Sequence, residues 1–127
     1  MNARTNDLPE WRLPITTTLV VSTAIATRDF QDVHHDAELA RSYGSQDIFL
    51  NILTTTGLVQ RYVTDSLGDV DLGGLALRLG APAYPGDELV FSGTRDGDTV
   101  SVVGAVSLGD HVTATVTLRE AQHGTPR

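Results

Sequence analysis

The stretch DIFLNILTTTGLVQRYVTDSL, residues 47–67, decides the fold because it is the one long helix candidate in the chain. Its apolar residues follow a helical period only loosely. The threonines at 54–56 have modest helix propensity and Gly57 has poor propensity, so such a helix depends on tertiary packing. Because Gly57 has no side chain and lets another backbone approach closely, we expect a central helix that is clasped by a sheet.

The chain on either side of this helix has a mainly β pattern. After it, apolar or alternating segments at 75–83, 88–94, 99–107 and 112–118 are separated by the turn sequences PGD, DGD and GD. Before it, residues 15–27 are rich in β-branched side chains and predict another strand. The order strand, short helix, long helix and four antiparallel strands predicts an α+β domain with one helix on a curled antiparallel sheet.

The two ends of the chain are polar. Residues 1–14 carry Pro9 and Pro14 and predict a flexible lead-in, in which Trp11 can anchor onto the body or onto a partner. Residues 119–127 predict a polar tail. We therefore expect one domain over residues 15–118, a length that is sufficient for a single core.

Composition argues against several classes of function. The net charge of −7 and the count of nine Lys and Arg residues disfavour a nucleic-acid binder, which needs clustered cations for phosphate contacts. The chain has no Cys and hence no disulfide, thiol nucleophile or Cys-based zinc site. No apolar run reaches the roughly 18 residues of a membrane span, and the N-terminus lacks the apolar core of a signal peptide. We expect a soluble, cytoplasmic protein.

The stretch RDFQDVHHDAELA, residues 28–40, concentrates the side chains that can carry chemistry. It holds four carboxylates and two of the four histidines in the chain. A carboxylate and an imidazole held close together form a proton-transfer pair. Asp36 can cap a short helix at 37–43 that Gly44 would end. We expect any active site to lie in this loop, between the first predicted strand and the long helix.

The spacing of Asp29, His34 and Asp36 resembles the signature Asp-x-Asn-Pro-[Leu/Ile/Val]-His-x-Asp of the MaoC-like (R)-specific enoyl-CoA hydratases. Longer blocks resemble one branch of that family, the small subunits of actinobacterial hydratases that act on steroid side-chain enoyl-CoA esters. These blocks are residues 27–36, 47–53, 57–65 and 108–116. The resemblance covers about residues 15–118 and implies a hotdog fold, in which a curled antiparallel sheet wraps a long central helix.

The resemblance also implies an active site with two parts. Asp29 and His34 are the implied catalytic pair. A water held between them is deprotonated as it attacks the β-carbon of the 2,3 double bond, and a proton is delivered to the α-carbon. Asn51, Ile52 and Gly57 are the implied oxyanion and substrate-binding positions. The resemblance implies no metal and no cofactor, because CoA is part of the substrate.

The sequence departs from the family pattern at two places. Gln31-Asp32 stands where the family has Asn-Pro, and Asn51-Ile52 stands where it has His-Gly. In the family, the backbone N–H of that glycine helps to hold the thioester oxygen. Ile52 keeps a backbone N–H near the helix N-terminus, where the helix dipole favours a developing negative charge, but its side chain crowds the site.

The other histidines have simpler interpretations. His34 and His35 cannot both point into one pocket from an extended segment, so the motif selects His34 and leaves His35 structural or exposed. A metal site made of these two residues and Asp36 lacks further ligands at a suitable spacing. We expect His111 and His123 at the surface.

The resemblance implies a partner as well. A single hotdog leaves sheet edges and one side of its helix exposed, which favours pairing. The implied partner is a larger, non-identical MaoC-like chain that lacks the catalytic pair and part of its own central helix, which leaves room for a steroid. The implied assembly is a heterotetramer with two copies of each chain, acting in cholesterol and related steroid catabolism.

Two other functions stay open on sequence alone. A hotdog thioesterase usually has a carboxylate in the middle of the central helix, whereas Asp47 and Asp65 lie near its predicted ends. A non-catalytic structural subunit of a hydratase complex is the second alternative, and the intact catalytic pair argues against it. Arg61 and Arg78 could contact CoA phosphates or form surface ion pairs, and the threonines at 54–56 could line the acyl pocket or pack the helix.

Overall fold

A computed structural model describes residues 5–68 and 70–119 of the chain. The predicted tail beyond residue 119, with His123, lies outside the described residues. The elements in chain order are β1 (Thr5–Pro14), α1 (Thr17–Ala26), the short 3-10 helix η1 (Asp32–His34), α2 (Ala37–Ser42), α3 (Ile52–Leu67), β2 (Asp71–Leu79), β3 (Glu88–Asp96), β4 (Thr99–Val106) and β5 (Gly109–Arg119).

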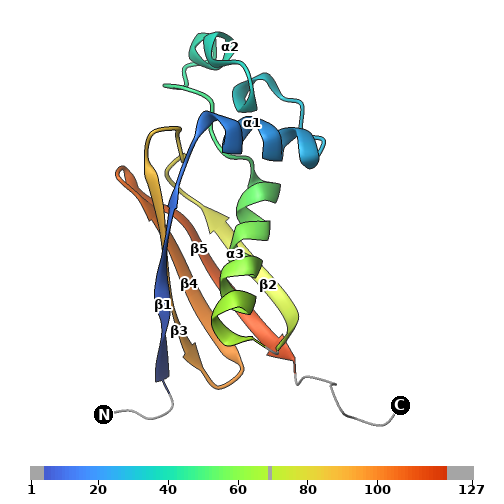
Figure 1. Cartoon of the computed structure of the whole chain (residues 1–127), viewed down its shortest axis with the longest axis vertical. Helices are drawn as coiled ribbons and strands as arrows, with labels where there is room; N and C mark the ends of the chain where they lie inside the picture. Colours follow the sequence, from blue (N-terminus) through green and yellow to red (C-terminus); the bar gives the residue numbers. More distant parts are fainter. Residues whose placement is uncertain (1–4, 69, 120–127) are drawn as a thin grey trace.

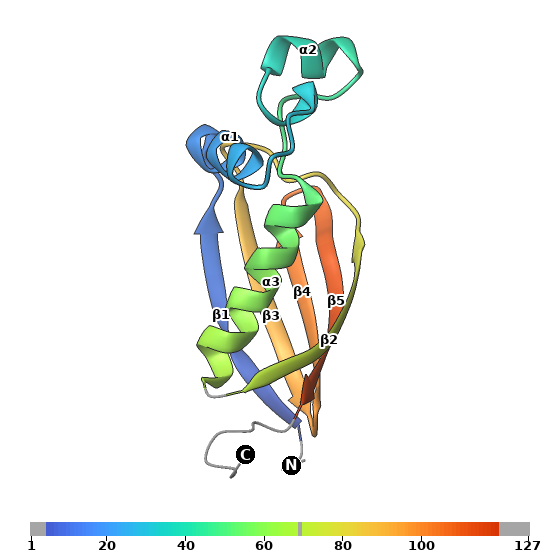
Figure 2. The ribbon, with the colours of Figure 1, turned by 90° about the vertical axis from the view of Figure 1, so that its right-hand side faces the viewer.

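The five strands form one antiparallel sheet in the order β1-β3-β4-β5-β2. Figures 1 and 2 show α3 lying along one face of this sheet, with α1 across the upper end of α3 and α2 farther out. The predicted α+β class and the central helix on an antiparallel sheet are confirmed. The candidate segment 28–40 therefore lies at one end of α3, away from the two ends of the described chain.

The core forms where the buried face of α3 meets the sheet. Val59, Tyr62 and Val63 of α3 are buried in one cluster with residues of β1, β3, β4 and β5. The Tyr62 ring stacks on Phe91 with centroids 5.5 Å apart, and its hydroxyl donates to the Pro9 carbonyl at 2.7 Å. Burial, aided by the negative charge of Glu10, raises the pKa of Tyr62.

The long helix begins later than its apolar pattern predicts. It starts at Ile52, because Asn51 has an extended backbone and its side chain caps the first turn by accepting from the Thr54 N–H at 2.9 Å. The preceding residues form loop hydrogen bonds instead. Phe49 N–H donates to the Val33 carbonyl and Leu50 N–H donates to the Ala83 carbonyl. This extended stretch joins α3 to the candidate segment.

The strand predicted over residues 15–27 is wrong, because Thr17–Ala26 is helix α1. Thr16 caps that helix by accepting from the Leu19 N–H at 2.9 Å. The hydroxyls of Thr23 and Thr27 each donate to the carbonyl four residues earlier. Burial of Val20 and Ala24 on the helix outweighs the small β preference of its residues, because propensity is a weak term beside tertiary packing.

The flexible lead-in predicted for residues 1–14 is wrong wherever the structure describes it. Residues 5–14 form edge strand β1, which pairs antiparallel with β3. The prolines fit there because Pro9 lies in the register shift between Leu8 and Trp11, and an edge strand can spare the missing N–H. Trp11 stacks on Phe91 with ring centroids 5.3 Å apart and so anchors the strand to the core.

The C-terminal strands follow the predicted pattern with shifted ends. β3, β4 and β5 fall on three predicted segments, whereas β2 begins at Asp71 and ends at Leu79. Residues 80–83 leave the sheet, because Gly80 N–H and Ala81 N–H donate to carbonyls of the β5 start, His111 and Asp110. This turn carries Ala83 to the extended segment that precedes α3.

The expectation that His111 lies at the surface is wrong, because only 2% of the residue is exposed. Its Nδ1 donates to the Ala81 carbonyl at 2.8 Å, since a carbonyl can only accept. Nε2 is then free to accept from the Thr55 hydroxyl at 2.8 Å. Burial lowers the pKa of His111 and the Ala81 bond partly opposes this. The neutral ring ties α3 to the start of β5.

The lowered pKa of His111 predicts a pH-dependent stability. A neutral buried histidine contributes stability that is complete above its unfolded pKa of 6.5 and is lost as the pH falls toward the lower folded pKa. We expect the free energy of unfolding, measured by urea denaturation, to decrease from about pH 7 to about pH 5, and to decrease less in His111→Gln. His35→Gln, at an exposed position, is the control. An unchanged pH dependence in His111→Gln would contradict the prediction.

Replacing Gly104 or Gly57 by alanine should change the stability of the fold in opposite directions. An alanine Cβ at Gly104 would lie 2.8 Å from Val112 Cγ1 and 3.1 Å from the Phe91 ring, so Gly104→Ala should destabilise the fold by about 1–3 kcal/mol. A Cβ at Gly57 would meet nothing within 4 Å, so no described backbone of this chain makes the predicted close approach. Gly57→Ala should stabilise α3 by about 0.8–1 kcal/mol. Thermal denaturation shifts of the same sign would contradict this assignment.

Candidate active site

The backbone of Asp29 is held by the end of α1. Asp29 N–H donates to the Ala24 carbonyl at 2.8 Å, and Arg28 N–H donates to the Ile25 carbonyl at 3.0 Å. This pair of bonds is the Schellman motif, which usually has glycine at the position of Arg28 because that residue adopts a left-handed conformation. Arg28 has φ of 59°, and no other described non-glycine residue has a positive φ. Asp29 therefore leaves α1 in a defined direction.

His34 faces Asp29 from the short helix η1. The imidazole is buried, with 7% of the side chain exposed, and its Nδ1 donates to the Phe49 carbonyl at 2.8 Å. In the neutral ring this bond leaves Nε2 as an acceptor. Nε2 lies 3.4 Å from Asp29 Oδ2, whose side chain is 23% exposed. The structure thus brings the two predicted catalytic side chains together, with Asp29 Oδ2 and His34 Nε2 facing each other near the surface.

Asn51 joins this pair from the start of α3. Its Nδ2 donates to Asp29 Oδ2 at 3.1 Å and to Thr27 Oγ1 at 2.8 Å. Its Oδ1 accepts from the Thr54 N–H, and the residue is only 3% exposed. The predicted oxyanion or substrate-binding position therefore has a side chain whose polar atoms already bond to this chain. Sequence reasoning had no signal for these contacts, because they join residues 22 and 24 positions apart.

Ile52 and Gly57 occupy different surroundings. Ile52 is the first residue of α3, where N–H groups have no partner within the helix, and the residue is 49% exposed. Gly57 lies more than a turn farther along α3 and is exposed.

Thr55 is buried against His111, while Thr54 Oγ1 is buried without a hydrogen-bond partner among the described atoms. Helix packing thus accounts for Thr55.

The neighbouring charged residues have structural roles. Asp36 caps α2 by accepting from the Leu39 N–H at 3.1 Å, as predicted. His35 is exposed, and its Nε2 lies 3.9 Å from Asp32 Oδ1.

Within residues 5–68 and 70–119, no group of three or more His, Asp or Glu side chains could hold a metal ion.

The carboxylates considered for a thioesterase are engaged elsewhere. Asp47 accepts from its neighbouring Ile48 N–H at 2.8 Å in the loop before α3. Asp65 pairs with Arg61 at 3.3 Å on the exposed side of α3, so Arg61 forms a surface ion pair, which is one of the two alternatives considered for it. The Arg61 guanidinium also lies over the Trp11 ring. Neither carboxylate lies near the middle of α3.

No helix among the described residues is long and apolar enough to cross a membrane.

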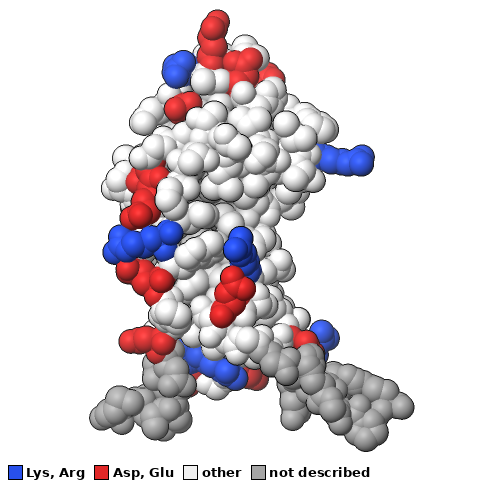
Figure 3. Space-filling view, viewed as in Figure 1, with Lys and Arg blue, Asp and Glu red and all other residues white. Residues whose placement is uncertain are grey.

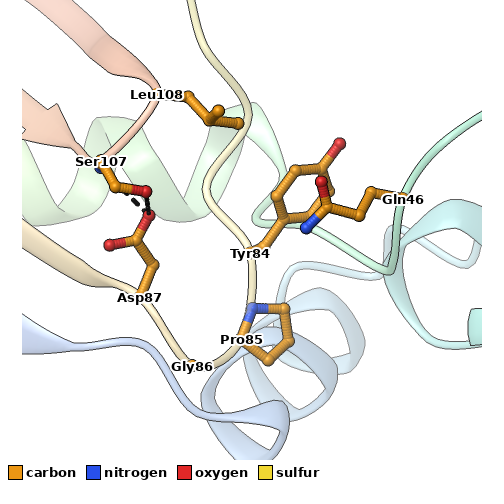
Figure 4. A pocket seen from close by; sticks show the side chains of 7 residues that line it. All are labelled: Gln46, Tyr84, Pro85, Gly86, Asp87, Ser107 and Leu108. Carbon is orange, nitrogen blue, oxygen red and sulfur yellow. Dashed lines mark hydrogen bonds between the residues drawn. The ribbon is translucent and has the colours of Figure 1, made fainter.

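A separate hollow of about 310 Å³ lies between residues 84–87 and the turn after β4. It is lined by Gln46, Tyr84, Pro85, Gly86, Asp87, Ser107 and Leu108 (Figure 4). The Ser107 hydroxyl donates to Asp87 at 2.7 Å, and this bond lowers the pKa of Asp87. The carboxylate therefore holds the turn, and the hollow contains neither member of the Asp29–His34 pair.

The comparisons with known proteins identify the family. No family model matches the chain. The chain is 59% identical over 117 residues to the 3-oxo-4,17-pregnadiene-20-carboxyl-CoA hydratase beta subunit of Mycobacterium tuberculosis, with 87% of this chain and 91% of that protein covered. The chain belongs to the MaoC-like hydratase family.

Solved structures of MaoC-like hydratases and related proteins share its fold. A chain in the ChsH1–ChsH2 complex from M. tuberculosis has a TM-score of 0.88 and 53% identity, with 94% of this chain and 99% of that chain covered. The (R)-hydratase from A. caviae has a TM-score of 0.76 at 17% identity, with 91% and 96% covered. The second likeness shows the fold alone, and together they confirm the predicted hotdog architecture.

Because Arg28 has a left-handed backbone conformation, we expect its replacement by glycine to stabilise the fold. Arg28→Gly removes a conformational strain of about 1–2 kcal/mol but adds unfolded-state entropy, so we expect a net stabilisation of about 0.5–1 kcal/mol. Arg28→Val places a β-branched residue in the same conformation and should destabilise the fold. The free energy of unfolding of both variants checks this, with Arg41→Gly and Arg41→Val in α2 as controls. Destabilisation by Arg28→Gly would contradict the assignment.

Proposed function

We propose that this chain carries the catalytic pair of an enoyl-CoA hydratase that acts on a steroid side-chain CoA ester. The observation that carries the proposal is the 3.4 Å approach of Asp29 Oδ2 to His34 Nε2 in a chain of this family. The name of the M. tuberculosis relative supports the substrate class. The proposed reaction needs no metal or further cofactor, because water is the co-reactant and CoA belongs to the substrate.

The pair can activate one water molecule. Both facing atoms are acceptors, so a water in contact with them donates its hydrogens to the carboxylate and to the imidazole. As the water oxygen bonds to the β-carbon, one of its protons passes to the pair and the 2,3 π-bond opens toward the α-carbon. The pair then returns a proton to the α-carbon. The product has gained one H₂O and the pair regains its starting state.

The start of α3 can stabilise the charge that develops during this step. Electron density moves onto the thioester oxygen as the double bond opens. The backbone N–H of Ile52 lies at a helix N-terminus, where unpaired donors and the helix dipole favour an anion. A single donor of this kind contributes about 10²–10³ in rate. The proposed oxyanion contact is thus to the backbone of Ile52 rather than to the Asn51 side chain.

The proposal includes a partner chain. The relative is named a beta subunit, and the similar solved chain belongs to a two-protein complex. Figure 3 shows few charged groups over α1 and the upper part of α3. Ile25 of α1 and Ile52 and Leu53 at the start of α3 are 55%, 49% and 54% exposed, so these two helices offer apolar surface to an acyl group or to a protein. We propose a larger MaoC-like partner in a heterotetramer, acting in cholesterol-type steroid catabolism in the cytoplasm.

Replacement of either member of the pair tests the proposed function. Asp29→Asn and His34→Gln keep side-chain size but remove a proton acceptor, so we expect kcat/KM for hydration of a steroid enoyl-CoA to fall about 10²–10⁴-fold in the assembled complex. Loss of enoyl absorbance measures the rate, and thermal denaturation verifies folding. Asp32→Asn and His35→Gln are the matched controls outside the pair. Near-normal turnover in Asp29→Asn or His34→Gln would refute the assignment.

A further inference from the structure

We infer that Asn51 is a positioning residue that fixes the Asp29 carboxylate against His34 and couples this pair to the N-terminus of α3. The inference rests on the proposed hydratase function and deepens it. It assigns no contact with substrate to the Asn51 side chain. The amide acts through the two groups that it holds, the Asp29 carboxylate and the first turn of the helix.

The orientation of the Asn51 amide is determined by its partners. Oδ1 faces the Thr54 N–H at 2.9 Å, and only an oxygen can accept that bond. Nδ2 must therefore face Thr27 Oγ1 at 2.8 Å and Asp29 Oδ2 at 3.1 Å, and both of those oxygens can accept. The Thr27 hydroxyl donates onward to the Thr23 carbonyl at 2.8 Å, so its lone pair is available to Asn51.

One buried side chain thus connects the segments that build the site. The oxygen of Asn51 caps α3, while its nitrogen reaches the last turn of α1 through Thr27 and the candidate base through Asp29. The contact on the carboxylate is with Oδ2, the same atom that faces His34 Nε2. The N–H donor therefore sets which oxygen faces the imidazole, and it sets where that oxygen lies relative to the Ile52 N–H.

The other support of the carboxylate is weak. Asp29 Oδ1 accepts from the Gln31 N–H at 3.4 Å, a long contact within the same loop. Without the Asn51 donor, the Asp29 side chain could rotate away from His34 while its backbone stays in the Schellman motif. A displacement of about 1 Å in a catalytic group can cost about 10²-fold in rate.

Two substitutions separate the capping role of Asn51 from its positioning role. Asn51→Ser and Asn51→Asp both keep a good helix N-cap oxygen for the Thr54 N–H. Serine is too short to donate to Asp29, and aspartate replaces the donor with an acceptor that repels the carboxylate. Thr16→Ser, a cap-preserving change at the start of α1, is the matched control.

Steady-state kinetics of the assembled complex test the inference. We expect kcat to fall about 10–10²-fold in Asn51→Ser and further in Asn51→Asp, with KM changed much less, because the proton acceptor is displaced rather than the binding surface. The Thr16→Ser complex should match the wild type. A kcat within about twofold of wild type in Asn51→Ser overturns the inference. A loss of rate that equals the unfolded fraction, measured by thermal denaturation, also overturns it.

A crystal structure of the Asn51→Ser complex keeps this test separate from the proposed function. If the wild-type complex does not hydrate enoyl-CoA, the proposed function fails, but the positioning role predicts the same structural change. The Asp29 carboxylate should turn away from His34 and lengthen the 3.4 Å separation of Oδ2 and Nε2. An unchanged Asp29 side chain in that structure overturns the positioning role whatever the reaction is.

Discussion

The packing of one face of α3 against the sheet is the constraint on which the rest of the structure depends. Val59, Tyr62 and Val63 bury that face, and His111 ties the first turns of the helix to β5 through Thr55. A sequence with three threonines and a glycine would form a poor helix alone. Contact with the sheet therefore supplies the stability of α3 and fixes where its N-terminus lies.

The candidate site forms at that N-terminus because three local structures meet there. The Schellman motif at the end of α1 holds the backbone of Asp29, and η1 carries His34. Asn51, the cap residue of α3, donates a hydrogen bond to the Asp29 carboxylate. The Schellman motif, the short 3-10 helix and the helix cap are each common structures by themselves. Their convergence places the Asp29–His34 pair near the first turn of α3, and the proposed addition of water needs a proton acceptor and a backbone donor of this kind.

The sequence predicted the parts of this arrangement that depend on local pattern or spacing. The alternation of residues 88–118 and its turn signals predicted three of the antiparallel strands, and Asp36 was predicted as a helix cap. The Asp29–His34 spacing identified two side chains that the structure places 3.4 Å apart. Residues 15–27 were misassigned because β-branched residues favour strands only weakly, and tertiary burial overrode that preference in α1.

The sequence by itself determined the class of fold through its hydrophobic pattern. Its resemblance to a known family indicated the family and the candidate pair, because the family motif is a local feature of the chain. Only the tertiary structure decided that residues 5–14 form an edge strand, that His111 is buried, and that Asn51 reaches Asp29. These contacts join residues that are far apart in the chain. No local pattern encodes them, because they arise from how the sheet, α1 and α3 pack together.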